Sequence, residues 1–130
     1  MKGCENFQGL KATFGKPIII DGLKGHLVEG KALEVQVGPL LRQNNLKLAA
    51  AESCTGGLIG HRLTNVPGSS DYYLGSIVAY SYEAKQRLLG VKQETLQTYG
   101  AVSQETVIEM AHGVRTVFNS DFPMENIIGI

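Results

Sequence analysis

The sequence contains no tryptophan, only two cysteines and four prolines, and no surplus of charge of either sign. Two cysteines, Cys4 and Cys54, are too few for the disulfide framework that staples small secreted domains. Twelve basic and twelve acidic side chains balance, so a broad electrostatic attraction for nucleic acid or anionic lipid is not expected. The longest apolar runs, such as residues 46–51, are far shorter than the roughly 20 residues of a bilayer-spanning helix. We therefore expect a cytoplasmic protein that binds neither nucleic acid nor membrane.

Composition and pattern divide the chain into two parts. The 130 residues are 43% hydrophobic and 18% charged, which is typical of one globular domain with its own core. Residues 1–30 are rich in glycine and carry one apolar patch at 17–20, which could form a short strand. We interpret residues 1–30 as a linker or the tail of a preceding unit, and place the domain at residues 31–130.

Helical and strand patterns alternate from Lys31 onward. Ser103 has the character of a helix N-cap and precedes the clearest amphipathic helix, whereas Gly90 suits the end of an earlier helix. The alternation predicts an α/β layered domain with a largely parallel sheet. Strands are predicted at 46–51, 74–81 and 127–130, and helices at 33–41 (closed by Asn44-Asn45), 58–66, 82–89, 93–98 and between Ser103 and Val117, where Val107, Met110, Ala111, Val114 and Val117 form an apolar stripe.

The strongest local signal is the run Glu52-Ser53-Cys54-Thr55-Gly56-Gly57, which lies between a predicted strand and a predicted helix. In α/β sheets the carboxyl ends of strands open onto the ligand crevice. A helix N-terminus there presents backbone N–H groups that can hold a phosphate, a carboxylate or a developing oxyanion. The Ser53 hydroxyl could act as a nucleophile at this turn. The alternative is that Ser53 and Thr55 are only helix N-caps.

A second signal is the run from Tyr80 to Lys85, where a strand end leads into a helix. A serine nucleophile needs a base, and a partly desolvated lysine can serve if its pKa falls toward neutrality. A tyrosine can position or relay a proton. The alternative for Lys85 is an ordinary solvated side chain on a helix, because most lysines are exposed.

Other candidates are weaker. Cys54 could be a thiol nucleophile at the helix N-terminus, or a small buried residue packing under the turn. Tyr72 and Tyr73 could form an aromatic wall for a planar ring, or could belong to the core. Arg62 and Arg115 could hold a phosphate, or could be solvated. The three histidines lack metal-ligand spacing and there is no Cys-x-x-Cys pair, so we predict no metal site.

Several motifs in order resemble one known family. They are ESCTGG, NVPGSS, VAYSYEAK, LLGV and GAVS, and the resemblance covers about Lys31 to Ile130. Together they resemble the CinA C-terminal domain, the family of nicotinamide-nucleotide amidases. The resemblance implies a three-layer α/β/α sandwich with a mixed, mostly parallel sheet.

The resemblance also implies a reaction and a site. Members of the family hydrolyse the carboxamide of nicotinamide mononucleotide, which releases ammonia and leaves nicotinic acid mononucleotide for recycling into NAD. The family's serine falls on Ser53 as the nucleophile, and its tyrosine and lysine fall on Tyr80 and Lys85 as the proton-handling pair. No metal or organic cofactor is implied. The expected substrate-binding residues are Glu52, Thr55, Gly56, Gly57 and Tyr72.

The sequence departs from the family at its C-terminus. Family members continue past the position of Ile130 with a glycine-rich loop, further strands and an arginine-containing helix. We therefore expect an incomplete domain whose exposed sheet edge favours self-association into a homo-oligomer. Besides the amidase hypothesis, two alternatives remain: a catalytically inactive nucleotide-binding or self-associating module, and a structural fragment completed by a partner.

Overall fold

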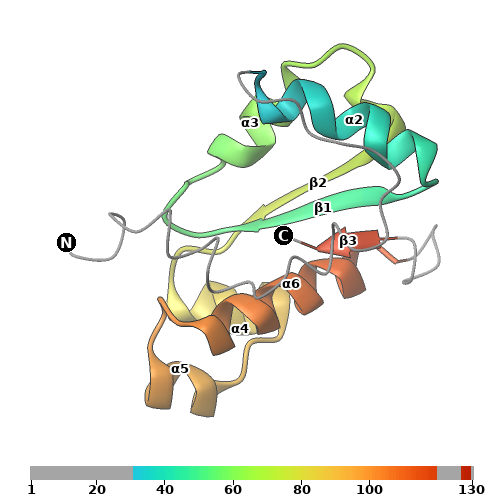
Figure 1. Cartoon of the computed structure of the whole chain (residues 1–130). Helices are drawn as coiled ribbons and strands as arrows, with labels where there is room; N and C mark the ends of the chain where they lie inside the picture. The colour runs from blue at the N-terminus through green and yellow to red at the C-terminus, as the bar shows by residue number, and fades with distance from the viewer. Residues whose placement is uncertain (1–30, 120–126, 130) are drawn as a thin grey trace.

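The computed structural model describes residues 31–119 and 127–129, which form an α/β unit around a three-stranded sheet (Figure 1). The strand order is β2-β1-β3, with β1 (Lys47–Glu52) in the centre between β2 (Tyr73–Val78) and β3 (Ile127–Gly129). Both ladders are parallel. The α/β prediction is therefore confirmed, while no antiparallel strand of the expected mixed sheet occurs in the described residues. The predicted strand at 17–20 lies outside them.

Helices cover both faces of the sheet (Figure 1). On one face lie α2 (Leu33–Gln43) and α3 (Leu58–Thr64), and on the other lie α4 (Tyr82–Leu89) and α6 (Gln104–Val117). The remaining helices are α5 (Gln93–Tyr99), which packs on α6, and the short 3₁₀ turn η1 (Ser69–Asp71). None of the helices in this described part has the length and apolar character to cross a membrane.

The core consists of two layers, because successive residues of β1 point to opposite faces of the sheet. Leu48 packs into the layer under α2 and α3, and Ala49 into the layer under α4 and α6. The small side chains of Ala49 and Ala50, both fully buried, let the helices approach the central strand closely. The first layer also contains Leu41, Leu63 and Tyr72, and the second contains Ala79, Leu89, Val91, Leu96, Met110 and Val114.

Capping residues fix where helices α4 and α6 begin and where α4 ends. The Oγ of Ser81 accepts a hydrogen bond from the Ala84 N–H at 3.0 Å and begins α4. The predicted cap Ser103 is confirmed, since its Oγ accepts the Thr106 N–H at 3.2 Å. Gly90 ends α4 with a positive φ of 67°, a conformation that favours glycine.

Two details of the sequence prediction were wrong. Strand β2 ends at Val78, not at Ser81, because the chain turns there toward the N-cap of α4. Val117 is 49% exposed, so the predicted apolar stripe of α6 is buried only as far as Val114. The next residue, Phe118, packs against the core again, so Val117 is exposed because it lies on another side of the helix end.

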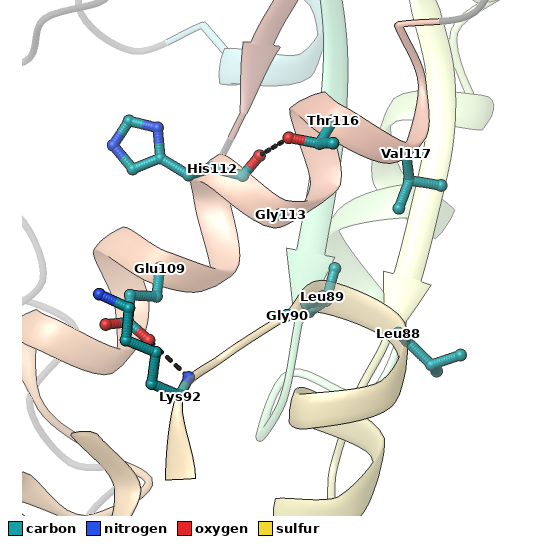
Figure 2. Close-up of a pocket in the computed structure, with 9 residues that line it drawn as sticks. All are labelled: Leu88, Leu89, Gly90, Lys92, Glu109, His112, Gly113, Thr116 and Val117. Carbon is teal, nitrogen blue, oxygen red and sulfur yellow. Dashed lines mark hydrogen bonds between the residues drawn. The ribbon is translucent and has the colours of Figure 1, made fainter. Parts of the chain in front are cut away.

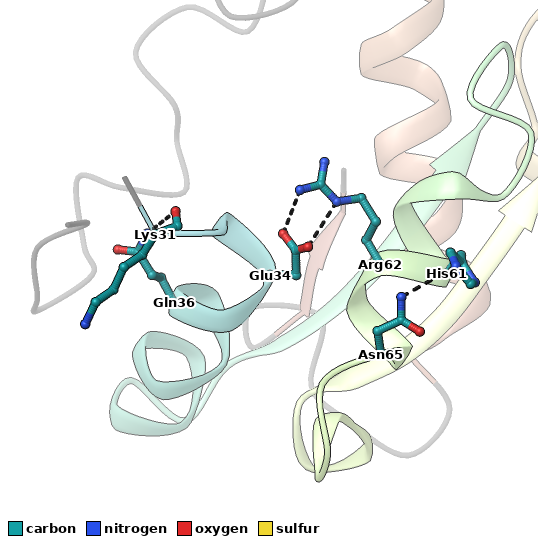
Figure 3. A network of polar contacts seen from close by, with 6 residues as sticks. All are labelled: Lys31, Glu34, Gln36, His61, Arg62 and Asn65. Atoms are coloured by element: carbon teal, nitrogen blue, oxygen red, sulfur yellow. Dashed lines mark hydrogen bonds and ion pairs between the residues drawn. The ribbon is translucent and has the colours of Figure 1, made fainter. Parts of the chain in front are cut away.

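The two helices of the first face are joined by an ion pair (Figure 3). The guanidinium of Arg62 on α3 donates to both carboxylate oxygens of Glu34 on α2, at 2.9 and 3.2 Å. This hydrogen-bonded guanidinium lowers the pKa of Glu34. The Arg62 side chain is nevertheless exposed, as the solvated interpretation expected, and it also has a protein partner in Glu34.

Candidate active site

Ser53 and Lys85 meet at the carboxyl edge of the sheet. Ser53 follows the last residue of β1, and Lys85 lies in the first turn of α4, which follows β2. Because β1 and β2 are adjacent and parallel, their carboxyl ends bring the two residues together. The Lys85 Nζ lies 2.9 Å from the Ser53 Oγ, within hydrogen-bond distance. Lys85 has no exposed surface, so the interpretation of a solvated lysine is wrong.

Main-chain carbonyls fix the Lys85 amine. Its Nζ donates to the Ala79 and Tyr80 carbonyl oxygens, each at 2.8 Å. Burial lowers the pKa of Lys85 because it penalises the charged ammonium, and the nearby Cys54 raises it to a smaller extent. The amine is thus held in place and shifted toward its neutral form, as a general base requires.

Glu52 directly precedes Ser53, and its side chain is hydrogen-bonded to the turn that follows. Its carboxylate is 1% exposed and accepts five hydrogen bonds. Burial alone would raise the pKa of Glu52, but the hydrogen bonds outweigh it, led by those from the Gly60 N–H and the Ser76 hydroxyl, and the pKa is lowered. The full set of donors is the N–H groups of Gly57, Ile59 and Gly60 and the hydroxyls of Thr55 and Ser76, at 2.8–3.0 Å.

The N-cap interpretation of the motif is wrong. Helix α3 begins after Gly57, and neither Ser53 nor Thr55 caps it with a side chain. The carboxylate of Glu52 takes that place and accepts the first N–H groups of the helix. The anion that these groups hold is therefore a carboxylate of the protein itself, and not the ligand that we expected there. Gly56 and Gly57 have φ values of 59° and 101°, where a side chain would be strained.

The other residues predicted for the site differ in their exposure to solvent. The Tyr80 side chain is 72% exposed, and its contact with Lys85 is through its carbonyl. Cys54 is exposed, so the prediction of a buried cysteine under the turn is wrong. Tyr72 is fully buried beside Leu48 and has the Arg42 guanidinium 4.9 Å from its ring centre. It therefore belongs to the core, and the structure does not bring it to Ser53.

Sequence reasoning missed Ser76 and named Tyr73 only as an aromatic wall or core residue, not as a member of this hydrogen-bond network. Ser76 lies inside the apolar strand β2, and its hydroxyl donates to Glu52 Oε1 at 2.8 Å and is hydrogen-bonded to the Tyr73 hydroxyl. Burial raises the pKa of Tyr73, the Ser76 hydrogen bond opposes this, and the negative charge of Glu52 adds to it. A serine within an otherwise apolar strand was the only sequence signal for this network.

A separate cavity of about 400 Å³ lies between the end of α4 and α6 (Figure 2). Leu88, Leu89 and Val117 line it together with the polar Glu109 and His112, while Ser53 and Lys85 do not. In residues 31–119 and 127–129, no three His, Cys, Asp or Glu side chains are grouped to hold a metal ion.

The structure thus defines an α/β domain in which a buried lysine is hydrogen-bonded to a partly buried serine at the carboxyl edge of the sheet. The family model of the CinA C-terminal domain matches residues 30–125. The chain therefore belongs to the CinA C-terminal domain family, as its motifs indicated.

Relatives with similar sequences carry CinA names. A CinA-like protein of Chloroherpeton thalassium is 46% identical over 123 residues, covering 90% of this chain and 29% of its own length. A putative competence-damage inducible protein of Moorella thermoacetica is 55% identical over 89 residues, covering 68% of this chain and 22% of its own length. The chain thus spans less than a third of these curated relatives.

Solved structures of the family have the same fold. The competence/damage inducible protein CihA from Agrobacterium tumefaciens is 42% identical, with a TM-score of 0.63 over 65% of this chain and 52% of that one. A CinA superfamily protein from Enterobacter cloacae is 35% identical, with a TM-score of 0.66 over 77% of this chain and 62% of that one.

Proposed function

We propose that this domain is an amidase that hydrolyses the carboxamide of nicotinamide mononucleotide to nicotinic acid mononucleotide and ammonia. The observation that carries the proposal is the 2.9 Å hydrogen bond between the buried Lys85 Nζ and the Ser53 Oγ. A lysine without exposed surface beside a serine hydroxyl is a base–nucleophile pair of the kind that activates serine in acyl transfer. Membership of the CinA family supports the choice of substrate.

The two carbonyls behind Lys85 support its role as the base. A neutral amine has two N–H bonds and one lone pair. If the Ala79 and Tyr80 carbonyls accept those two hydrogens, the lone pair faces the remaining neighbour, the Ser53 Oγ. In that state the serine hydroxyl donates to the lysine, which is the direction needed to remove its proton.

The proposed reaction has two halves. The Ser53 Oγ attacks the carboxamide carbon while Lys85 takes the hydroxyl proton, and the resulting tetrahedral adduct carries a negative oxygen. The adduct collapses as Lys85 returns the proton to the leaving nitrogen, so ammonia departs and an ester with Ser53 remains. A water molecule, deprotonated by Lys85, then attacks the ester carbon, and Lys85 passes that proton to the Ser53 Oγ as the ester bond breaks, which releases the carboxylate product and restores the serine.

The surroundings of Ser53 provide for the rest of the substrate. The N–H groups of Cys54 and Thr55, directly after Ser53, are the candidates for stabilising the negative oxygen, because those of Gly56 and Gly57 already bond the Ser53 carbonyl and Glu52. The Tyr80 ring is exposed and its carbonyl contacts Lys85, and we propose that this ring contacts the pyridine ring of a substrate. We propose that Thr55, Gly56 and Gly57 line the entrance to the substrate site. Hydrogen bonds to the Glu52 carboxylate fix the positions of Thr55 and Gly57.

Ammonia release from nicotinamide mononucleotide tests the proposal. Wild type is compared with Ser53→Ala, which lacks the nucleophile, and with Ser70→Ala, a control at an exposed serine in η1. We expect release by wild type and Ser70→Ala, and loss of release in Ser53→Ala. If folded wild-type protein releases no ammonia but binds the nucleotide in calorimetry, the domain is a nucleotide-binding module and the amidase proposal is wrong.

A further inference from the structure

We propose that Glu52 is a positioning residue, which sets the Ser53 Oγ against the Lys85 Nζ without touching the substrate. This inference rests on the amidase function proposed above. Its starting point is that the Glu52 carboxylate is buried and that all five of its hydrogen bonds go to protein donors. A carboxylate so occupied has little capacity left for a ligand.

The five donors come from the elements that present the dyad. Thr55 and Gly57 lie in the turn that contains Ser53, and Gly60 lies in α3, which continues from that turn. Ser76 lies in β2, the strand that leads to Lys85. One side chain therefore connects the segment that carries the nucleophile to the segment that carries the base.

The main chain of Glu52 makes a second connection to Lys85. Its carbonyl oxygen accepts a hydrogen bond from the Ala79 N–H at 2.8 Å. The Ala79 carbonyl in turn accepts one from the Lys85 Nζ at 2.8 Å. Residue 52 is thus linked to both members of the dyad, to Ser53 by the peptide bond and to Lys85 through Ala79.

Only a carboxylate fits this position. The neighbouring groups all donate to Glu52, and an ionised carboxylate is an acceptor at both oxygens. Whichever way the amide of a glutamine turned, its NH₂ group would face a backbone N–H that cannot accept, that of Gly60 at one oxygen position or those of Gly57 and Ile59 at the other. Such mismatches are costly in a buried network, and in Glu52→Gln they would loosen the turn next to the nucleophile.

The test compares Glu52→Gln with a matched carboxylate far from the dyad. Glu109 also accepts a backbone N–H and a hydroxyl, from Lys92 and Thr95, each at 2.8 Å. Two readouts are measured with nicotinamide mononucleotide and with a serine-reactive fluorophosphonate: kcat and KM for hydrolysis, and the rate of Ser53 labelling. The labelling reports Ser53 reactivity without requiring substrate recognition.

We expect Glu52→Gln to lower both kcat and the labelling rate by about tenfold or more, with KM little changed, because hydrogen bonds to a charged group are strong. Glu109→Gln should leave both readouts near wild type. A raised KM with unchanged kcat and labelling would identify Glu52 as a substrate ligand and overturn the proposal. Unchanged values throughout would overturn it as well.

Ser76→Ala keeps the test decisive if Glu52→Gln does not fold. It removes one hydrogen bond to Glu52 Oε1, and we expect a smaller loss of about threefold to tenfold in kcat and labelling. A folded Ser76→Ala protein with wild-type kcat would then overturn the proposal. If wild type labels at Ser53 but does not hydrolyse the nucleotide, the proposed function fails while the labelling still tests Glu52. Wild type that neither labels nor hydrolyses overturns both.

Discussion

Gly113 of α6 lies against Leu89 of α4 so closely that a Cβ added to Gly113 would be 1.9 Å from the Leu89 carbonyl oxygen. The atom it would meet belongs to the backbone, so no side-chain rotation can relieve the clash. Helix α4 carries Lys85 one turn earlier. The close crossing of α6 and the helix that carries the base therefore depends on glycine at position 113.

Gly113→Ala should destabilise the domain, although alanine is the better helix former. We expect the free energy of unfolding to fall by about 1–3 kcal/mol, since overpacking forces the backbone to shift. Urea unfolding measures the change. Thr116→Ala, at an exposed position of the same helix, should have little effect, and a Gly113→Ala protein as stable as wild type would show that the two helices can separate without loss.

The pH dependence of hydrolysis tests Lys85 as the base. Burial lowers the pKa of Lys85 below the ordinary 10.5, and only the neutral amine can accept the Ser53 proton. Activity should therefore rise with pH through this lowered pKa. Initial rates of ammonia release between mildly acidic and mildly alkaline pH provide the profile. A flat profile would remove Lys85 from the role of base.

Glu52 should make the free energy of unfolding depend on pH in the acidic range. Its pKa is lowered in the folded protein from the ordinary 4.5, so the folded state binds fewer protons than the unfolded state between the two values. The stabilisation is fully present above the unfolded pKa and is lost as pH falls through the folded pKa. Denaturant unfolding at several pH values should show the gap between wild type and Glu52→Gln narrowing below about pH 4.5. A gap independent of pH would mean that the pKa of Glu52 is the same in the folded and unfolded states, and a gap that widened at low pH would mean that folding raises this pKa.

Cys54 offers a chemical test of the site. The residue is exposed and directly follows Ser53, so a bulky maleimide on its sulfur should block the approach of substrate. In a Cys4→Ala background we expect alkylation to abolish hydrolysis, while Cys54→Ala should stay active and resist the reagent. Mass spectrometry confirms the modification. Full activity of the alkylated protein would place the substrate on another side of Ser53.

Local signals predicted the helices well. The predicted cap Ser103 and the predicted terminal Gly90 act on their own helices through bonds that span a few residues, whereas the cap Ser81 falls within a predicted strand. The order of strands and helices followed in the same way, because periodicity reflects which face of each element is buried. These parts of the fold could therefore be read before any tertiary contact was known.

The features that depend on tertiary contacts could not be read in this way. The cap of α3 is the carboxylate of Glu52, at the end of the preceding strand. Local capping rules consider only the residues next to the helix start, so they do not identify it. The burial of Lys85 depends on the carbonyls of Ala79 and Tyr80 and on Ser53, 32 positions earlier. The exposure of Cys54 depends on the same packing, since Glu52 occupies the space beneath the turn.

The distance along the chain between paired strands predicts the order in which the strands associate during folding. Strand β1 pairs with β2 through residues such as Leu48 and Tyr73, 25 positions apart, and with β3 through Lys47 and Ile127, 80 positions apart. Closing the longer loop costs more chain entropy, so nearby segments should associate first. Ser53 and Lys85 both belong to the segment that can close early. We therefore expect pulse-labelled hydrogen exchange during refolding to protect β2 amides before those of β3, with the reactive pair assembled before the third strand docks.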